Sequence, residues 1–155
     1  MSQAALQFKD YYVIETQYKT DPFLPKIPDE KIVPSFSYDI SPCDEQSDSA
    51  YIELGIEIGD SELMHSSYYV YARILGYFSL TGDISDPKER DTYFRINAVA
   101  ILYPYLRSLI SDLTSRGTES PIILPTMNIQ KMMLELEEEK QKKQKVENSS
   151  KNPSE

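Results

Sequence analysis

The chain is expected to adopt an α+β fold, in which a four-stranded antiparallel sheet is packed by a long helix and a C-terminal helix. Four segments with a strand-like period come first along the sequence, and two segments with a helical period follow them. Strands and helices do not alternate, as they would in a parallel sheet built from βαβ units. The 155 residues are enough for one domain with a core of its own.

The first two predicted strands carry large apolar side chains at every second position. Residues 35–40 show this alternation over a short length, ahead of a polar turn at residues 41–48. Residues 8–19 show it over a longer one, so the prediction places four residues on one face of the first strand: Phe8, Tyr12, Ile14 and Tyr18.

Four prolines lie between these two strands, in residues 21–34. Each proline fixes its φ angle and lacks a backbone N–H, which excludes both a helix and a central strand. We therefore expect an extended crossing loop, held down by the apolar side chains of Phe23, Leu24, Ile27 and Ile32.

The third and fourth predicted strands differ in the character of their faces. Residues 52–58 alternate isoleucine or leucine with glutamate or glycine, so one face is apolar and the other is acidic or bare. Residues 68–80 carry large groups on both faces. One face of this fourth strand suits a helical layer. The other needs a second cover or a ligand, and it comprises Tyr69, Tyr71, Leu75 and Tyr77.

The long helix is predicted from about residue 91 to Arg116, where apolar residues recur at steps of three and four. Gly117 suits the left-handed position that often follows a helix. Pro104 lies inside the segment. Because its ring clashes with the preceding turn, we expect a kink or a restart of the helix there.

The end of the chain is predicted to contain a linker, a second helix and a tail. Residues 120–127 are apolar and bracketed by prolines, which predicts an extended backbone. Asn128 is a suitable N-cap for the last helix, whose apolar stripe runs to Leu136. Residues 138–155 are charged and nearly free of apolar side chains, which is typical of disorder. The sequence thus predicts one domain at residues 1–137, followed by a charged tail.

The composition excludes several classes of function. A net charge of −9 repels phosphate backbones, so general binding of nucleic acids is not expected. The single cysteine, Cys43, cannot form a disulfide within the chain, which leaves the cytoplasm as the default location. No stretch resembles a secretion signal or approaches the length of a membrane span, so we expect no membrane insertion.

The residues that most catalytic and metal sites need are scarce. His65 is the only histidine, so neither a Ser–His nor a Cys–His pair can form without it, and a transition-metal site would rest on carboxylates alone. The five glycines form no phosphate-binding loop. Glu53 and Glu57 could imitate a glycosidase pair, but acids that alternate along a strand are more typical of a solvated edge. We therefore expect a protein that is not an enzyme and uses no metal or cofactor.

The second half of the chain resembles one known family. In the SecB protein-export chaperones, a Pro-Tyr-x-Arg core leads to a helix ending in Ser-Arg-Gly-Thr, and this signature is similar to residues 101–118, ILYPYLRSLISDLTSRGT. The family's proline-bounded linker is similar to residues 121–128, PIILPTMN. The end of its fourth strand looks like residues 76–80, GYFSL. The resemblance covers about residues 8–137.

Membership in this family implies both an assembly and a mode of binding. The assembly is a homotetramer, a dimer of dimers joined through sheet edges and long helices. Apolar grooves for unfolded polypeptides lie between the sheet, the crossing loop and the last helix, where aromatic rings and flexible methionines tolerate many client sequences. In this chain the groove residues would be Phe23, Leu24, Tyr69, Tyr71, Tyr77, Ile122, Ile123, Leu124, Met127, Met132 and Met133.

A SecB-like chain is expected to be an ATP-independent holdase, which keeps unfolded or aggregation-prone polypeptides from aggregating. The alternative is an interaction protein of the same fold that binds one specific partner, for example an antitoxin. Family members dock on the motor ATPase SecA through acidic residues on strands one and four, and the aligned positions here are Glu15, Lys19, Tyr69 and Tyr71. Only Glu15 keeps the charge, which weakens docking to SecA. This favours a private client, as in chaperones of toxin–antitoxin pairs or of mobile elements.

Overall fold

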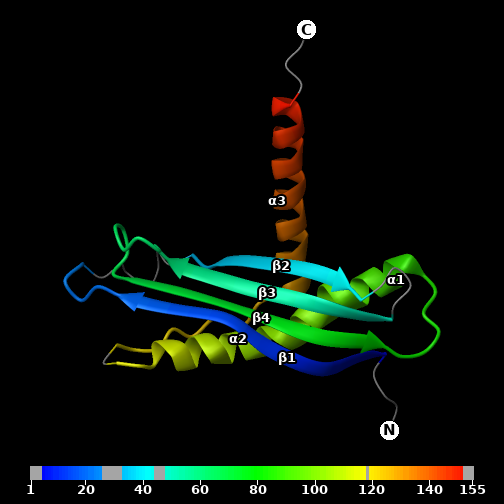
Figure 1. Cartoon of the computed structure of the whole chain (residues 1–155), viewed down its shortest axis with the longest axis horizontal. Coiled ribbons are helices and arrows are strands. Elements are labelled where there is room, and N and C mark those ends of the chain that lie inside the picture. Colours follow the sequence, from blue (N-terminus) through cyan, green and yellow to red (C-terminus); the bar gives the residue numbers. More distant parts are fainter. Residues whose placement is uncertain (1–4, 26–32, 44–47, 118, 152–155) are drawn as a thin grey trace. The chain divides into compact units, whose positions relative to one another are not determined.

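The computed structural model describes residues 5–25, 33–43, 48–117 and 119–151, and Figure 1 shows the chain as a ribbon. The chain divides into two compact units, Met1–Pro125 and Thr126–Glu155. The first unit holds a four-stranded sheet and the long helix, and the second holds the C-terminal helix. The α+β fold predicted from the sequence is confirmed.

The strands of the sheet are antiparallel and follow the order β1-β4-β3-β2. All four predicted strands are present, as β1 (Leu6–Thr20), β2 (Ser35–Pro42), β3 (Ser49–Gly59) and β4 (Tyr68–Leu80). Two parts of the predicted connections lie outside the described residues. These are residues 26–32 of the crossing loop, with Ile27 and Ile32, and residues 44–47 of the polar turn.

One face of the sheet packs against the long helix and forms the core of the first unit. Residues paired directly across antiparallel strands share a face, so the even-numbered residues of β3 and β4 all point toward α2 (Ala98–Thr114). The helix approaches the sheet closely at Gly76, where a Cβ atom would lie 2.7 Å from a methyl carbon of Leu102. The fully buried side chains include Ile52, Leu54, Ile56, Ile58, Val70, Ile74, Phe78, Leu102, Leu106 and Ile110. The opposite face of the sheet, with the odd-numbered residues of β3 and β4, is called the outer face below.

The first strand departs from the strict alternation that the sequence predicts. Its pairing with β4 shifts twice, once after Phe8 and once after Val13. Each shift is a β-bulge, in which an extra residue moves the side chains that follow to the other face. Phe8 and Tyr18 therefore face α2, whereas Tyr12 lies on the outer face and Ile14 has no partner in β4. The prediction that these residues share one face is wrong, because the bulges interrupt the period of two.

The long helix begins earlier than predicted and contains a wide turn. Asp86 caps the first segment, α1 (Pro87–Thr92), by accepting a hydrogen bond from the backbone N–H of Lys88 at 3.0 Å. A π-helical turn, η2 (Tyr93–Asn97), then leads into α2. The apolar spacing marked the buried part of the helix, while its first turn is exposed and polar and left no such signal.

The long helix continues through Pro104 without a restart. The proline ring removes one backbone N–H and crowds the carbonyl of Ala100 one turn earlier. Both residues are solvent-exposed, so water can satisfy that carbonyl oxygen. After α2, Gly117 adopts the expected positive φ, at 111°.

The second unit contains α3 (Ile129–Ser150), which extends well beyond Leu136. Asn128 caps it as predicted, by accepting a hydrogen bond from the N–H of Lys131 at 3.0 Å. The extension places glutamates before lysines in the sequence, an order that favours ion pairs one helical turn apart. These residues are also strong helix formers. Residues 138–150 are therefore helical, although their charge alone is typical of disorder.

Candidate functional site

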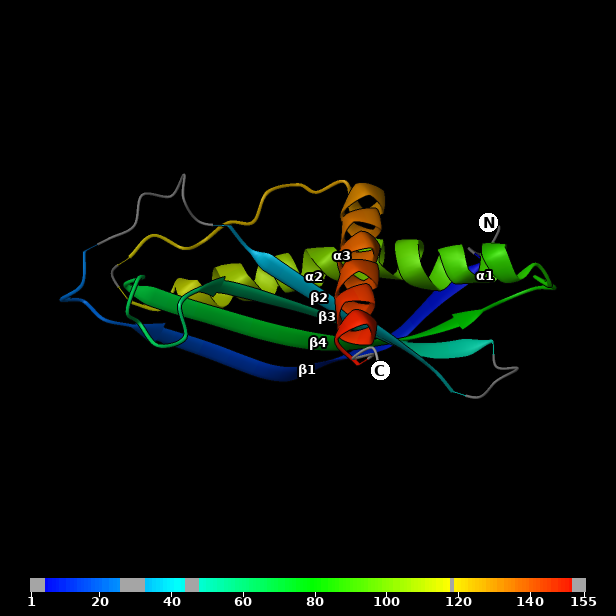
Figure 2. The ribbon, with the colours of Figure 1, turned by 90° about the horizontal axis from the view of Figure 1, so that it is seen from above.

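A linker of residues 119–125 lies along α2 and is tied to it at two points (Figure 2). The backbone N–H of Ile122 donates to Thr114 Oγ1 at 2.8 Å, and Tyr103 Oη donates to the carbonyl oxygen of Pro125 at 2.5 Å. Tyr103 precedes Thr114 in the helix, whereas Pro125 follows Ile122. The linker therefore runs antiparallel to α2.

The three apolar residues of the linker differ in exposure. Ile123 is 67 % exposed, Leu124 is 2 % exposed, and Ile122 is half-buried. Prolines on both sides favour an extended backbone, in which neighbouring side chains point in opposite directions. Leu124 thus anchors the linker, and Ile123 presents an apolar side chain to solvent on a backbone whose position is fixed.

Tyr103 also connects the linker to the sheet. Its ring centroid lies 6.1 Å from that of Phe36 in β2. Burial raises the pKa of the Tyr103 hydroxyl, although Arg107 acts in the opposite direction. The hydroxyl therefore stays neutral and keeps donating to Pro125 at physiological pH. Sequence reasoning did not single out Phe36 or Tyr103, because both read as ordinary apolar positions of a strand and a helix.

Phe23 and Leu24 follow β1 in a turn that Asp21 organises. Asp21 Oδ1 accepts a hydrogen bond from the N–H of Phe23 at 2.9 Å, and its carbonyl oxygen accepts one from Leu24 at 3.3 Å. The N–H of Asp21 donates to the carbonyl of Ser67 at 2.8 Å, which ties the turn to the start of β4. Leu24 is half-buried, but Phe23 is 94 % exposed. Phe23 therefore does not hold the crossing loop down as the sequence predicts.

The predicted tyrosines of β4 lie on the outer face, away from the linker. Tyr69, Tyr71 and Tyr77 occupy odd positions of β4, whereas α2, to which the linker is tied, packs against the even positions. The sheet thus separates the tyrosines from the linker, and the two groups do not line one groove within the first unit. Tyr71 and Tyr77 are half-buried, and Tyr69 is 5 % exposed.

Tyr69 is part of a link across three strands. Its hydroxyl donates to Glu57 Oε2 at 3.0 Å, and Lys19 Nζ lies 5.3 Å from its ring centroid. Burial, and then the bond to the Glu57 carboxylate, raises the pKa of Tyr69 to about 12. Lys19 also donates to the carbonyl of Ser61 at 2.7 Å. Tyr69 and Lys19 are thus engaged in contacts within the chain.

Glu15, the acidic residue expected to face SecA, lies beside a cation. Arg73 Nη2 is 3.8 Å from Glu15 Oε2, and Arg73 Nη1 is 3.4 Å from Glu53 Oε1. These partly exposed ion pairs contribute little to stability individually. They do offset the negative charge that a cationic partner would meet at Glu15 and Glu53.

The predicted methionines belong to the second unit. Met127 precedes the N-cap and is half-buried. Met132 and Met133 are the buried residues of α3, while Leu134, the next residue, is 58 % exposed. The helix thus has one buried apolar side near its start.

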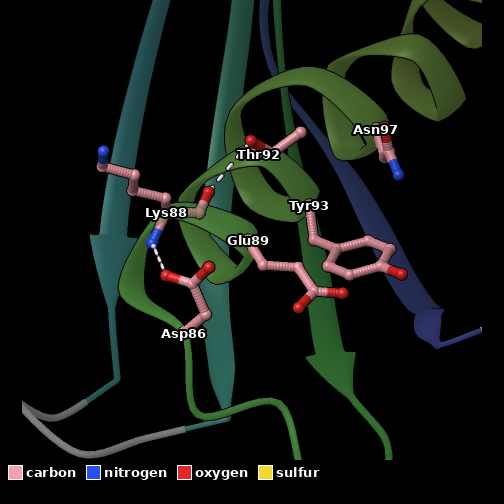
Figure 3. A pocket seen from close by; sticks show the side chains of 6 residues that line it. All are labelled: Asp86, Lys88, Glu89, Thr92, Tyr93 and Asn97. Atoms are coloured by element: carbon pink, nitrogen blue, oxygen red, sulfur yellow. Dashed lines mark hydrogen bonds between the residues drawn. The ribbon is translucent and has the colours of Figure 1, made fainter.

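A shallow depression lies beside the start of the long helix (Figure 3). It encloses about 480 Å³ and is lined by Asp86, Lys88, Glu89, Thr92, Tyr93 and Asn97. Two of these side chains bond to helix backbone, since Asp86 accepts from the N–H of Lys88 and Thr92 Oγ1 donates to the Lys88 carbonyl at 2.9 Å. None of the predicted site residues lines this depression. Within the described ranges, no group of three or more His, Cys, Asp or Glu side chains is placed to hold a metal ion.

The turn between β3 and β4 is organised by a single carboxylate. Asp60 accepts hydrogen bonds from the backbone N–H groups of Glu62 at 3.0 Å, Met64 at 3.1 Å and His65 at 3.0 Å. The bonds from Glu62 and His65 are the largest causes that hold the pKa of Asp60 below its usual value of 3.8. The charged form of Asp60 is therefore the form that stabilises the turn.

Asp60→Asn is expected to loosen this turn at neutral pH, because a neutral amide accepts these bonds more weakly. The amide protons of Met64 and His65 should exchange with solvent roughly tenfold faster. Acid should act on the native turn in the same way. Because the folded pKa is the lower one, the stabilisation is complete above about pH 4 and is lost as the pH falls through the folded pKa. Exchange measured by NMR checks both effects, with Glu62→Gln as a control that leaves the acceptor in place. Equal exchange rates in both variants would count against this role of Asp60.

Known proteins are similar to this chain in sequence or in fold. Residues 2–142 match the model of the family described as preprotein translocase subunit SecB. Uncharacterized protein MJ0357 of Methanocaldococcus jannaschii is 30 % identical over 144 residues, which covers 90 % of this chain and 89 % of that protein. Among the residues described by the structure, no helix has the length and apolarity to cross a membrane.

A solved structure gives a further comparison. The SecB-like chaperone Rv1957 of Mycobacterium tuberculosis, in complex with a ChAD peptide from the Rv1956 HigA1 antitoxin, aligns with a TM-score of 0.58 and 18 % identity. The alignment covers 79 % of this chain and 91 % of that one, and at this identity it supports the fold alone. The family model, in contrast, spans nearly the whole sequence. The chain belongs to the SecB family.

Proposed function

We propose that this protein is an ATP-independent molecular chaperone, a holdase that binds unfolded or aggregation-prone polypeptides in the cytoplasm. The observation that carries the proposal is the exposure of large apolar side chains on backbone that hydrogen bonds hold in place. Phe23 is 94 % exposed beside the Asp21 turn, and Ile123 is 67 % exposed between the two ties of the linker. Burial of such side chains against a client is favourable without any nucleotide or cofactor.

The proposed chaperone acts as a homotetramer, a dimer of dimers. β1 is a 15-residue strand at one edge of the sheet, and long edge strands tend to pair with another chain. It exposes four consecutive apolar side chains: Tyr11 at 42 %, Tyr12 at 52 %, Val13 at 49 % and Ile14 at 45 %. Tyr105 of α2 is 40 % exposed and continues this surface, since its ring centroid lies 4.8 Å from that of Tyr11. A second copy paired along β1 would cover these residues.

A second candidate function is that of a dedicated chaperone for one partner, such as an antitoxin. Two observations favour it over delivery of general clients to SecA. The structure of Rv1957 holds an antitoxin peptide. In this chain, Glu15 lies beside Arg73, and Lys19 and Tyr69 take the aligned positions where carboxylates are expected. A dedicated chaperone would protect its own client but not unrelated denatured proteins.

Aggregation of chemically denatured citrate synthase, followed by light scattering, tests the holdase. We expect the wild-type chain to suppress it, and the double variant Phe23→Glu/Ile123→Glu to need about tenfold more protein for the same effect, because charge disfavours apolar contact. The matched control is Leu134→Glu/Val146→Glu, which adds the same charge at sites 58 % and 67 % exposed on α3. Suppression by the control and not by the first variant supports the proposed surface. No suppression by the wild type would leave only the dedicated function.

A further inference from the structure

β2 lies at one edge of the sheet, and its hydrogen bonds to β3 determine which of its backbone N–H and C=O groups point outward. The N–H of Cys43 donates to the carbonyl of Ser49 at 3.1 Å, just beyond the last paired residues of β2 and β3. In antiparallel strands, hydrogen-bonded and non-hydrogen-bonded pairs alternate. The odd-numbered residues of β2 therefore bond to β3. Phe36, Tyr38 and Ile40 occupy non-bonded pairs, so their N–H and C=O groups point away from β3.

The pairing of β3 with β4 independently gives the same assignment of the bonded residues. The N–H of Leu80 donates to the carbonyl of Asp48 at 2.6 Å, which makes the even-numbered residues of β3 bond to β4. The odd-numbered residues of β3 are then left to bond to β2. Within the part of the chain that the structure describes, β3 is the only strand beside β2, so the outward groups of Phe36 and Ile40 meet no further strand.

Three residues limit how much of this edge can pair with another strand. The outward N–H of Ile40 donates to the Asp39 carboxylate at 3.0 Å, so a side chain occupies it. Pro34 and Pro42 are also even-numbered and lie on either side of Phe36 and Ile40, and proline has no N–H to donate. Short edge strands that carry prolines and charged side chains are typical devices against uncontrolled strand pairing. The edge thus admits a short segment between the prolines and excludes a long one.

The two faces of β2 indicate what such a segment would be. On the face toward α2, Phe36 and Ile40 are half-buried, and Phe36 lies next to Tyr103. On the outer face, Ser37 and Asp39 are exposed, and Asp39 is paired with Glu53 of β3. A neighbouring strand would continue both faces. Its side chains would alternate between apolar ones beside Phe36 and polar or basic ones beside Asp39.

We propose that an extended segment of an unfolded client adds to the free edge of β2 as a fifth strand, and that Asp39 limits this pairing by occupying the N–H of Ile40. The inference rests on the proposed chaperone function and names the form in which the client binds. It selects short client segments in which apolar and polar residues alternate. Such segments form strands in native proteins, so the edge would hold regions that otherwise aggregate through their own backbones.

Two substitutions at one position separate the backbone contact from the charge. Asp39→Asn keeps an oxygen acceptor at the same distance from the N–H of Ile40 and removes the charge. Asp39→Glu keeps the charge but carries it one methylene farther out, which frees the N–H. The probe is a fluorescein-labelled ten-residue peptide of alternating valine and threonine with a lysine at each end. One further hydrogen bond corresponds to about twofold to tenfold tighter binding. We expect this gain for Asp39→Glu and not for Asp39→Asn.

Hydrogen exchange of the full chain reads the same contact directly. Saturating peptide should slow exchange of the Phe36 amide in the wild type, and of both the Phe36 and Ile40 amides in Asp39→Glu. The Ser37 amide, which already bonds to β3, serves as the internal control. Peptide with N-methyl groups on alternate residues along one edge should bind more weakly than the unmodified peptide.

The outcomes distinguish this inference from the function on which it rests. A peptide that binds without protecting Phe36, and equally well to all three proteins, overturns strand addition and leaves the holdase intact. Suppression of aggregation without any peptide binding would likewise overturn strand addition and leave the holdase intact. Loss of both peptide binding and suppression of aggregation overturns the proposed function together with this binding mode.

Discussion

Phe78→Ala is expected to lower the free energy of unfolding by about 3–5 kcal/mol. Phe78 lies in the central strand β4, is 0 % exposed, and stacks on Phe8 with ring centroids 5.2 Å apart. Removal of the ring leaves a cavity under α2 that nearby Gly76, which has no side chain, cannot fill. Unfolding by urea at a fixed chain concentration measures the change, because assembly would otherwise alter the apparent stability.

Phe23→Ala is the matched control for this substitution. It removes the same atoms from a side chain that is 94 % exposed, so the free energy of unfolding should change by no more than about 0.5 kcal/mol. Domains of this size have total stabilities of about 5–15 kcal/mol, so the loss at Phe78 would be a large share. Similar losses at both positions would show that the core of the first unit does not lie between β4 and α2.

Val13→Pro is expected to dissociate the assembly while leaving the subunit folded. Val13 pairs with Ile74 of β4, whose phase is set by the bond between Leu80 and Asp48, so the N–H of Val13 points away from the sheet. Proline is tolerated at such an edge position, but it removes a donor that a second β1 would need. The mass in solution should fall from four times the 17.8 kDa chain mass to at most twice that mass.

Val13→Thr keeps the branched side chain and the N–H group, and it should retain the full mass. Circular dichroism and thermal unfolding of the proline variant show whether the subunit still folds. A wild-type chain that sediments as a monomer would contradict the proposed tetramer. A folded proline variant that keeps the wild-type mass would show that β1 edges do not join the subunits.

Local patterns in the sequence were sufficient for most of the fold. Strands β2, β3 and β4 were found because their side chains alternate between a buried and a solvated face, which is visible without knowledge of the partner strand. The bulges of β1 were missed because an extra residue such as Ile14 is defined only by what β4 pairs with. Neither glycine nor proline marks these positions. The full length of α3 was missed for a different reason, since its order of charges was read as composition alone.

The candidate site was predictable in its parts but not in its arrangement. The prolines around residues 122–124 and the resemblance to SecB are sufficient to predict the linker from the sequence. Which of its side chains faces solvent depends on contacts 8 and 22 positions apart in the sequence, from Ile122 to Thr114 and from Tyr103 to Pro125. The side of the sheet that holds the β4 tyrosines likewise depends on where α2 packs. No local pattern records such contacts.

The two bulges of β1 have a consequence for how this strand can change in length. Each inserts one residue, so their effects on facing cancel, and Phe8 near one end and Tyr18 near the other both point toward α2. Removal of a single residue between them would turn one end over and carry either Phe8 or Tyr18 to the outer face. Insertions and deletions in this strand are therefore tolerated only in pairs, because a second change is needed to return the side chains at the far end to their original face.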